Sequence, residues 1–337
     1  MRHTDRQVRG KGTDRVTPGP RKIVSFRRLA LVLMPTEACN FRCAYCFESN
    51  AGGRMSRETA AGLQRWLTNR FPELEDLTLN WYGGEPLLAV NIVEQLQRHV
   101  LTLLDRYPDV DFHGAMTTNG YLLRPELLRK LVSLRVTTYQ ISLDGPGEHH
   151  DRTRALAGGQ GTFNRIWRNL LGARDLDERF FILLRVHVHR NNLEVVPDLL
   201  ETLAGSFAGD DRFSLMLRPV SRLGGRGNEC HEALTAEEAL EPVDQLRTLA
   251  RDLGLHLFEG GQSSGRCYTA LPHMWLVRAD GTLGKCPVAL SHPANSLGRL
   301  RGDGRVEVDA ERLQPWLRGV FSGDPADLSC PAMGLAR

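Results

Sequence analysis

An alternation of strand-like and helical patterns constrains the fold of this chain more than any other feature. From residue 29 to about 220, short apolar runs alternate with longer stretches whose apolar residues recur every three or four positions. The runs cover residues 29–34, 77–82, 112–118, 138–143, 180–188 and 213–220, and the helical patterns cover 60–71, 92–104, 126–134, 163–173 and 193–203. Such alternation indicates a parallel sheet with helical crossovers. Six units are too few for a closed eight-stranded barrel, so we predict an α/β fold built as a partial (β/α)6 barrel of the TIM type.

A loop with three closely spaced cysteines follows the first predicted strand. Cys39, Cys43 and Cys46 have the spacing Cys-x3-Cys-x2-Cys. Thiolates are the usual ligands of iron–sulfur clusters, which normally take four, so three would leave one iron open to a small molecule. A structural zinc site is the alternative, but no Cys-x2-Cys or His-x3–5-His partner follows within the next sixty residues.

Three further loops carry glycine and polar residues at the ends of predicted strands. They contain Gly83, Gly84, Glu85 and Pro86 after the second strand, Asn119 at the end of the third, and Ser142 and Asp144 at the end of the fourth. The carboxyl ends of parallel strands meet at one rim, where chemistry gathers in such folds. Glycine and Asp-Gly are also ordinary turn signals, and that alternative stays open.

These motifs, in this order, resemble the radical S-adenosylmethionine (SAM) superfamily. The resemblance rests on Cys-x3-Cys-x-Tyr-Cys, Gly-Gly-Glu-Pro-Leu-Leu, Thr-Thr-Asn-Gly-Tyr-Leu-Leu and Ile-Ser-Leu-Asp-Gly-Pro. It extends to the peptide- and protein-modifying branch, which includes anaerobic sulfatase-maturing enzymes and maturases of ribosomally made peptides. It implies that Cys39, Cys43 and Cys46 hold a [4Fe-4S] cluster whose open iron chelates SAM. Electron transfer from that cluster would then cleave SAM to methionine and a 5′-deoxyadenosyl radical.

The resemblance also implies a set of SAM-binding residues. They are Tyr45 near the adenine, Gly83, Gly84, Glu85 and Pro86 near the methionine amino group, Asn119, Ser142 and Asp144 near other polar parts, and Arg154 near the carboxylate. Arg185, in the fifth predicted strand, is a second candidate for the SAM carboxylate. His187 and His189 alternate on the same strand, and we interpret at least one of them as barrel packing.

The four cysteines outside this loop suggest a second cluster. Gly281-x4-Cys286 predicts a hairpin turn that delivers a thiolate, and with Cys267 and Cys330 it resembles the auxiliary-cluster domains called SPASM and Twitch. The cysteines are too few for a full SPASM set. The alternatives are an auxiliary cluster with three protein ligands, completion by Cys230 or by a carboxylate, and loss of the cluster. We expect one auxiliary iron–sulfur cluster held by Cys267, Cys286 and Cys330. In Twitch domains the third cysteine has a partner two or three positions away, and the candidate neighbours of Cys330 at that spacing are Asp327 and Met333.

The chain divides into three predicted parts. Residues 1–28 form a flexible basic arm with nine Lys/Arg and two Asp, a local charge of +7 within a net +3, and the arm is too short for a folded leader-peptide-recognition domain. Residues 29–222 form the partial barrel. Residues 223–337 form a linker and a SPASM/Twitch-like auxiliary domain, either complete or truncated. No apolar stretch is long enough to span a membrane, so we expect a cytoplasmic protein, and we do not expect a nucleic-acid partner.

The predicted function follows from the resemblance. We expect a radical SAM enzyme that abstracts hydrogen from a residue of a peptide or protein substrate, with an electron donor such as flavodoxin or ferredoxin. A Twitch-type dehydrogenase of a small-molecule alcohol is the first alternative. A non-catalytic, metal-stabilised scaffold is the second. We assign no catalytic residue from the sequence. Asp280, near Cys286, is a candidate general base, but Asp-Gly is foremost a turn signal.

Overall fold

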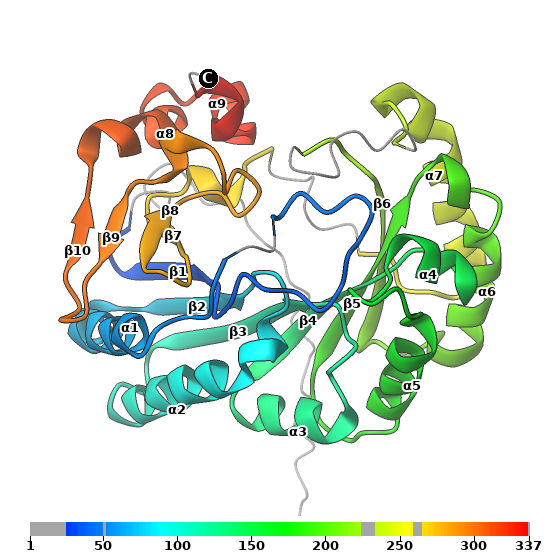
Figure 1. Cartoon of the computed structure of the whole chain (residues 1–337), viewed down its shortest axis with the longest axis horizontal. Coiled ribbons are helices and arrows are strands. Elements are labelled where there is room, and N and C mark those ends of the chain that lie inside the picture. Colours follow the sequence, from blue (N-terminus) through cyan, green and yellow to red (C-terminus); the bar gives the residue numbers. More distant parts are fainter. Residues whose placement is uncertain (1–24, 50–51, 224–232, 259–264, 336–337) are drawn as a thin grey trace, which may run out of the picture.

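A single ten-stranded sheet organises the protein (Figure 1). The computed structural model describes residues 25–49, 52–223, 233–258 and 265–335. Residues 1–24 of the predicted basic arm and Cys230 lie outside the described residues. The strand order is β10-β9-β8-β7-β1-β2-β3-β4-β5-β6.

The first six strands are parallel and follow one another across the sheet in chain order. They are β1 (Arg28–Leu33), β2 (Asp76–Trp81), β3 (Asp111–Thr118), β4 (Val136–Leu143), β5 (Phe181–Val188) and β6 (Phe213–Pro219). Each predicted strand is present, with ends that differ by one or two residues. The α/β fold with an open parallel sheet is therefore confirmed.

The helices between these strands lie on the outer face of the curved sheet (Figure 1). They are α1 (Arg57–Arg70), α2 (Val90–Arg106), α3 (Pro125–Ser133), α4 (Glu148–Thr153), α5 (Phe163–Arg174) and α6 (Val196–Phe207). A further helix, α7 (Ala236–Asp252), follows β6 and packs against β6 and α6. Short 3-10 helices are η2 (Phe71–Glu73), η3 (Pro86–Ala89), η4 (Arg190–Asn192), η6 (Tyr268–Ala270), η7 (Pro293–Asn295) and η8 (Pro331–Gly334). The helix α4 was not predicted because six mostly polar residues give no apolar periodicity.

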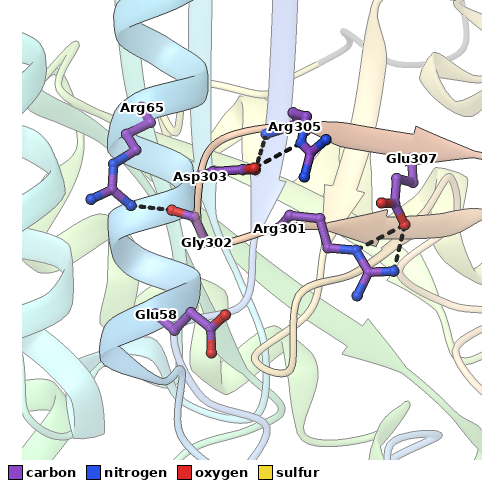
Figure 2. A pocket seen from close by; sticks show the side chains of 7 residues that line it. All are labelled: Glu58, Arg65, Arg301, Gly302, Asp303, Arg305 and Glu307. Atoms are coloured by element: carbon purple, nitrogen blue, oxygen red, sulfur yellow. Dashed lines mark hydrogen bonds and ion pairs between the residues drawn. The ribbon is translucent and has the colours of Figure 1, made fainter.

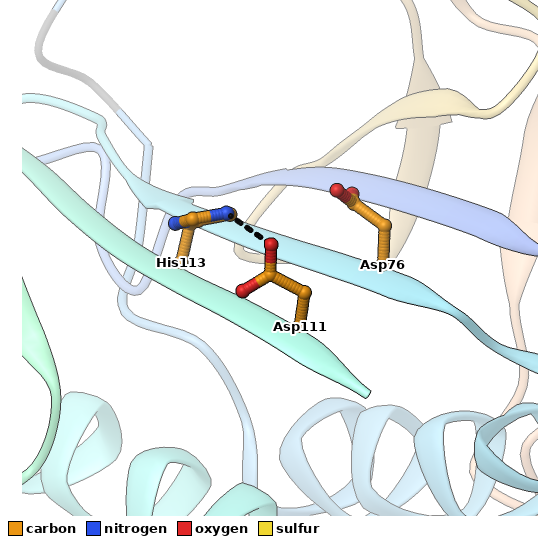
Figure 3. Close-up of side chains that lie close together, drawn as sticks. All are labelled: Asp76, Asp111 and His113. Atoms are coloured by element: carbon orange, nitrogen blue, oxygen red, sulfur yellow. Dashed lines mark hydrogen bonds and ion pairs between the residues drawn. The ribbon is translucent and has the colours of Figure 1, made fainter. Parts of the chain in front are cut away.

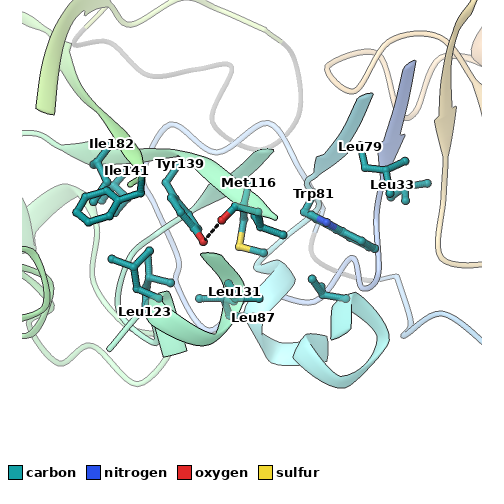
Figure 4. Close-up of a cluster of buried hydrophobic side chains, with 14 of the residues drawn as sticks. Leu33, Leu79, Trp81, Leu87, Met116, Leu123, Leu131, Tyr139, Ile141 and Ile182 are labelled. Carbon is teal, nitrogen blue, oxygen red and sulfur yellow. Dashed lines mark hydrogen bonds between the residues drawn. The ribbon is translucent and has the colours of Figure 1, made fainter. Parts of the chain in front are cut away.

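The main core fills the space between the sheet and these helices (Figure 4). Side chains alternate across a strand, so one face of each strand packs on helices and the other faces the barrel interior. Trp81 of β2 and Tyr139 of β4 are fully buried on the helix side, beside Leu87 and Leu131. The buried Tyr139 hydroxyl donates a hydrogen bond to the Val136 carbonyl at 2.6 Å, so it is not left without a partner in the core. The apolar core thus occupies the helix side of the sheet, and the polar side chains on the other face point into the barrel interior.

The C-terminal region extends the same sheet on the side of β1. Its elements are β7 (Met274–Val277), β8 (Thr282–Gly284), β9 (Gly298–Leu300), β10 (Val306–Val308), α8 (Ala310–Ser322) and α9 (Pro325–Ser329). β7 pairs with β1 in parallel, and β8, β9 and β10 continue as an antiparallel meander. The predicted turn at Gly281 joins β7 to β8, with a φ of 86°. The boundary that we predict at residue 222 remains a prediction.

We find no helix within the described residues that is long and apolar enough to cross a membrane.

Candidate functional site

The cysteine loop after β1 is fixed by main-chain contacts to the segment after α4. Three backbone hydrogen bonds of 2.8–2.9 Å join residues 40–44 to residues 153–157, and Phe41, fully buried, forms an antiparallel bridge with Leu156. Burial raises the pKa of Cys39 to about 12 and that of Cys43 to about 11, and the charge of neighbouring cysteines contributes to both. The three thiols therefore lie near one another on a loop whose path the fold determines.

The two glycines after β2 let the backbone approach this loop closely. Gly83 has a φ of 114°, a conformation that other residues rarely adopt. A Cβ atom on Gly83 would lie 2.2 Å from the Thr36 carbonyl oxygen, and one on Gly84 would lie 2.4 Å from the Ala38 carbonyl oxygen. These positions require glycine because the loop before Cys39 occupies the space of any side chain.

Glu85 connects the loop after β2 to the end of β3. Its fully buried carboxylate accepts hydrogen bonds from the Thr118 hydroxyl at 2.8 Å, the Asn119 amide at 2.7 Å and the Leu87 amide at 3.0 Å. Burial raises the pKa of Glu85, while these hydrogen bonds oppose the increase. Pro86 follows as the first residue of η3. The side chain of Glu85 thus fixes the rim of the site through Asn119, whose side chain donates to the Asn40 side chain at 2.9 Å.

Asp144, at the end of β4, is the centre of a buried polar network. Its carboxylate accepts from the Tyr45 hydroxyl at 2.5 Å and the Thr153 hydroxyl at 2.9 Å, and it lies 3.1 Å from Nδ1 of His187. The Arg154 guanidinium donates to the Tyr45 hydroxyl at 2.8 Å. The network therefore links the cysteine loop to β4, β5 and the end of α4.

The charges of this network follow from burial and from the guanidinium of Arg154. Burial alone would raise the pKa of Asp144, but the hydrogen bond from His187 and the charge of Arg154 hold it well below its usual range. Burial lowers the pKa of His187 to about 4, although Asp144 opposes this shift. At neutral pH we therefore expect an ionised Asp144, a neutral His187 that donates from Nδ1, and a cationic Arg154. A site with one buried anion and one buried cation favours a ligand that carries both a positive and a negative group.

His150 supports Asp144 from the outer side. Its Nδ1 accepts from the Asp144 amide at 3.3 Å, and its Nε2 lies 3.1 Å from the Thr162 hydroxyl. That hydroxyl donates to the Arg154 carbonyl at 2.7 Å, so it accepts the Nε2 proton of a neutral imidazole. Burial lowers the pKa of His150 to about 4, in agreement with this tautomer.

A buried ion pair ties the cysteine loop to the C-terminal strands. Arg278, just after β7, donates to the two carboxylate oxygens of Glu37 at 2.6 Å and 3.0 Å. The Glu37 side chain is 9% exposed, and that of Arg278 is 30% exposed. Glu37 stands two residues before Cys39, so this pair sets where the loop leaves β1.

The second cysteine group also converges. Cys267 donates its amide to the Leu328 carbonyl at 2.8 Å, which brings it beside the chain leading to Cys330. Burial raises the pKa of Cys286, and the charges of Cys267 and Cys330 raise it further. Lys285 is fully buried beside them, and its ammonium donates to two main-chain carbonyls at 2.6 Å.

Asp327 and Met333, the candidate neighbours of Cys330, are occupied or exposed elsewhere. The Asp327 carboxylate accepts from Arg318 at 2.7 Å, and the Met333 side chain is 87% exposed. Both Asp280 oxygens accept from Thr282, so the structure uses this carboxylate in the turn before β8. A role of Asp280 as general base stays a prediction.

The structure brings the predicted SAM-binding residues to the carboxyl ends of β1 to β4, around the cysteine loop. Ser142 is buried on β4 beside Arg185 in the strand register. Their binding roles remain predictions. The sequence interpretation missed the contact of His187 with Asp144 and the pair of Glu37 with Arg278. The two-residue spacing of His187 from Arg185 was the one available signal, because it places both on the same face of β5.

Two other polar groups are accounted for by internal contacts. Asp76, Asp111 and His113 lie together at the amino ends of β2 and β3, the opposite rim from the cysteines (Figure 3). His113 bonds to Asp111 at 3.2 Å, and Asp76 pairs with Arg28 at 3.7 Å.

The other group lines a shallow pocket between α1 and the turn from β9 to β10 (Figure 2). Arg301 pairs there with Glu307 at 2.5 Å, and Arg305 pairs with Asp303 at 2.7 Å. The charges of this pocket are balanced, so it offers no preference for a charged ligand.

Comparisons with known proteins give a family and several relatives. A family model described as the radical SAM superfamily matches residues 33–203. Mycofactocin maturase MftC of Mycolicibacterium smegmatis is 28% identical over 308 residues, which are 86% of this chain and 73% of that protein. An AdoMet-dependent heme synthase of Methanosarcina barkeri is 28% identical over 204 residues, 60% of this chain and 53% of that protein.

Two solved structures have a similar fold. The structure of anSMEcpe with bound AdoMet and Cp18Cys peptide has a TM-score of 0.64 and 19% identity, over 85% of this chain and 80% of that one. Streptococcus suis SuiB bound to its precursor peptide SuiA has a TM-score of 0.63 and 16% identity, over 90% of this chain and 69% of that one.

Proposed function

Because the chain belongs to the radical SAM superfamily, we propose that it modifies a peptide or protein substrate by hydrogen abstraction. The observation that carries this proposal is the loop of Cys39, Cys43 and Cys46 at the rim of the barrel, fixed by the segment after α4. MftC is named a maturase, and anSMEcpe and SuiB have been solved with peptides bound. These relatives support a peptide over a small molecule.

The three thiols fit a [4Fe-4S] cluster, because soft thiolates are its usual ligands and three of them leave one iron for SAM. The cluster, when bound, supplies the electron that cleaves SAM to methionine and a 5′-deoxyadenosyl radical. The raised pKa values of Cys39 and Cys43 mean that cluster binding must release their protons. The Gly83–Gly84 backbone and Asn119 then line one side of the SAM position.

The buried network of Asp144, Arg154 and Tyr45 would orient SAM from the side opposite the glycine loop. An ionised Asp144 attracts the cationic and hydrogen-bond-donating parts of SAM, and Arg154 attracts its carboxylate. Because Tyr45 bonds to both residues, it fixes the third cysteine of the motif relative to them. Phe41, fully buried, and its backbone bridge to Leu156 hold the cysteine loop in place on this side of the site.

We also propose one auxiliary iron–sulfur cluster held by Cys267, Cys286 and Cys330, with a fourth ligand that we do not assign. The mutual influence of the three thiols supports it. Flavodoxin or ferredoxin is our proposed electron donor. A reducing cytoplasm suits these free thiols.

The test of the function uses peptides encoded beside the gene. The reconstituted protein is incubated anaerobically with dithionite, SAM and each peptide, and the peptide mass is followed. We expect a mass change that depends on SAM and disappears in the Cys39→Ala/Cys43→Ala/Cys46→Ala variant. SAM cleavage that leaves every peptide unchanged but oxidises a small alcohol would replace this proposal with the dehydrogenase alternative.

A further inference from the structure

Two arginines share the inner face of the last two barrel strands. In the parallel register of β5 and β6, His187 lies opposite Arg218, and Arg185 lies opposite Met216. Residues paired in this way point to the same side of the sheet, and so do residues two apart on one strand. His187 reaches Asp144 and Tyr45, so its face is the one that forms the site. Arg185 and Arg218 therefore point into the barrel interior, whereas Leu184, Val186 and Leu217 are buried on the helix side.

Neither arginine has a negative partner among the described residues. No described carboxylate forms an ion pair with Arg185 or Arg218, and the buried Nε of Arg185 has no hydrogen-bond partner there. Burial lowers the pKa of Arg185, and the positive charge of Arg218 lowers it further. Asp144, an anion on this face, is already paired with His187 and contacts the Arg154–Tyr45 pair. The buried carboxyl group of Glu48 bonds to Tyr82, and burial raises its pKa to about 7.

Two neighbouring guanidiniums without a counter-charge are unfavourable in a partly buried site. An anion would relieve this repulsion, and a guanidinium fork matches a carboxylate in a bidentate geometry. Arg218 is the exposed member, at the carboxyl end of the outermost barrel strand, where a ligand enters from solvent. Arg185 is the inner member. It lies close enough to Tyr45 and Tyr82 for both to raise its pKa, against the larger effect of burial. The pair therefore leads from the open rim toward the cysteine loop.

We propose that Arg185 and Arg218 form a subsite that holds a carboxylate of the peptide substrate, from an acidic side chain or from the chain terminus. This inference rests on the proposed function and narrows its substrate class. The SAM carboxylate is the other source of the same chemistry. Arg154 already lies nearer the cysteine loop, and Arg218 lies on the strand farthest from β1 among the six barrel strands, so we favour the substrate.

The test measures binding without turnover, so it does not depend on finding the true peptide. Glutarate and its neutral analogue glutaramide are titrated into the reconstituted protein by anaerobic calorimetry at constant ionic strength, with and without SAM. We expect glutarate to bind and glutaramide not to bind, whether SAM is present or absent. Arg185→Gln and Arg218→Gln should each weaken binding about tenfold or more, as expected for a lost charged hydrogen bond. Arg98→Gln, on the exposed surface of α2, removes the same charge and should change nothing.

Each other outcome overturns the proposal. Competition between glutarate and SAM, or a loss of SAM affinity in Arg218→Gln, assigns the pair to the SAM carboxylate. Equal binding of glutaramide, or binding that both variants keep, shows that no carboxylate subsite exists. Folding of Arg185→Gln is checked by urea unfolding, where we expect an equal or higher midpoint because the variant removes an unpaired charge. A lower midpoint shows that Arg185 has a structural partner and contradicts the premise. A peptide that is modified normally by both variants leaves the proposed function intact and removes this subsite alone.

Discussion

The ion pair between Glu37 and Arg278 should contribute strongly to stability, and Arg278→Met tests it. Removing the arginine leaves the Glu37 carboxylate, 9% exposed, without the cation to which it is bonded twice. Breaking a buried pair in this way costs about 3–5 kcal/mol. Arg278 is 30% exposed, so water can reach part of the vacated space. We therefore expect a cost at or below the lower end of that range, with a free energy of unfolding reduced by about 2–3 kcal/mol.

The assay is urea unfolding of the reduced apo-protein, followed by circular dichroism, as a double-mutant cycle with Glu37→Met. The double variant buries no unpaired charge, so it should be more stable than the sum of the two single changes predicts, by about 1.5–3 kcal/mol. Arg301→Met breaks an exposed pair with Glu307 and should have a much smaller effect, because water screens exposed pairs. Additive effects of the two single changes would refute the reasoning, because they would mean that water already screens the Glu37–Arg278 pair.

Two further predictions concern the loop and the buried histidine. Gly83→Ala combines an unfavourable φ with a Cβ atom 2.2 Å from the Thr36 oxygen, so we expect it to lower iron retention after reconstitution at least several-fold. Gly205→Ala, with open space in α6, should retain iron fully, and equal retention by both variants would contradict this prediction. His150 stays neutral in the fold, with a pKa of about 4, but in the unfolded chain it binds a proton below about pH 6.5. The advantage of wild type over His150→Gln in free energy of unfolding should therefore shrink by about 2–3 kcal/mol as the pH falls from about 7 to about 4. An advantage that does not change with pH would show that His150 is not desolvated.

The six barrel strands and the cysteine loop could be predicted because their signals are local. Apolar alternation set each strand to within two residues, and the spacing of Cys39, Cys43 and Cys46 is legible within eight positions. Gly83 was predicted as part of a SAM-binding turn, but the contact that requires glycine there, with the Thr36 carbonyl, was not foreseen.

The features that were missed depend on contacts between distant parts of the chain. Glu37 and Arg278 are 241 residues apart, and nothing near either residue indicates the other. The pairing of β7 with β1 likewise joins a four-residue strand to the start of the barrel. Sequence spacing placed His187 on a face but could not show whether that face met Asp144.

The most direct measurement of the central claim is SAM cleavage by the reconstituted protein. Wild type and the Cys39→Ala/Cys43→Ala/Cys46→Ala variant are compared under dithionite with SAM, and iron, zinc and 5′-deoxyadenosine are quantified. We predict deoxyadenosine from wild type alone, and about four fewer irons in the variant, as the loss of one four-iron cluster requires. Equal deoxyadenosine from both proteins, or zinc in place of iron in wild type without SAM cleavage, would contradict the assignment of these cysteines.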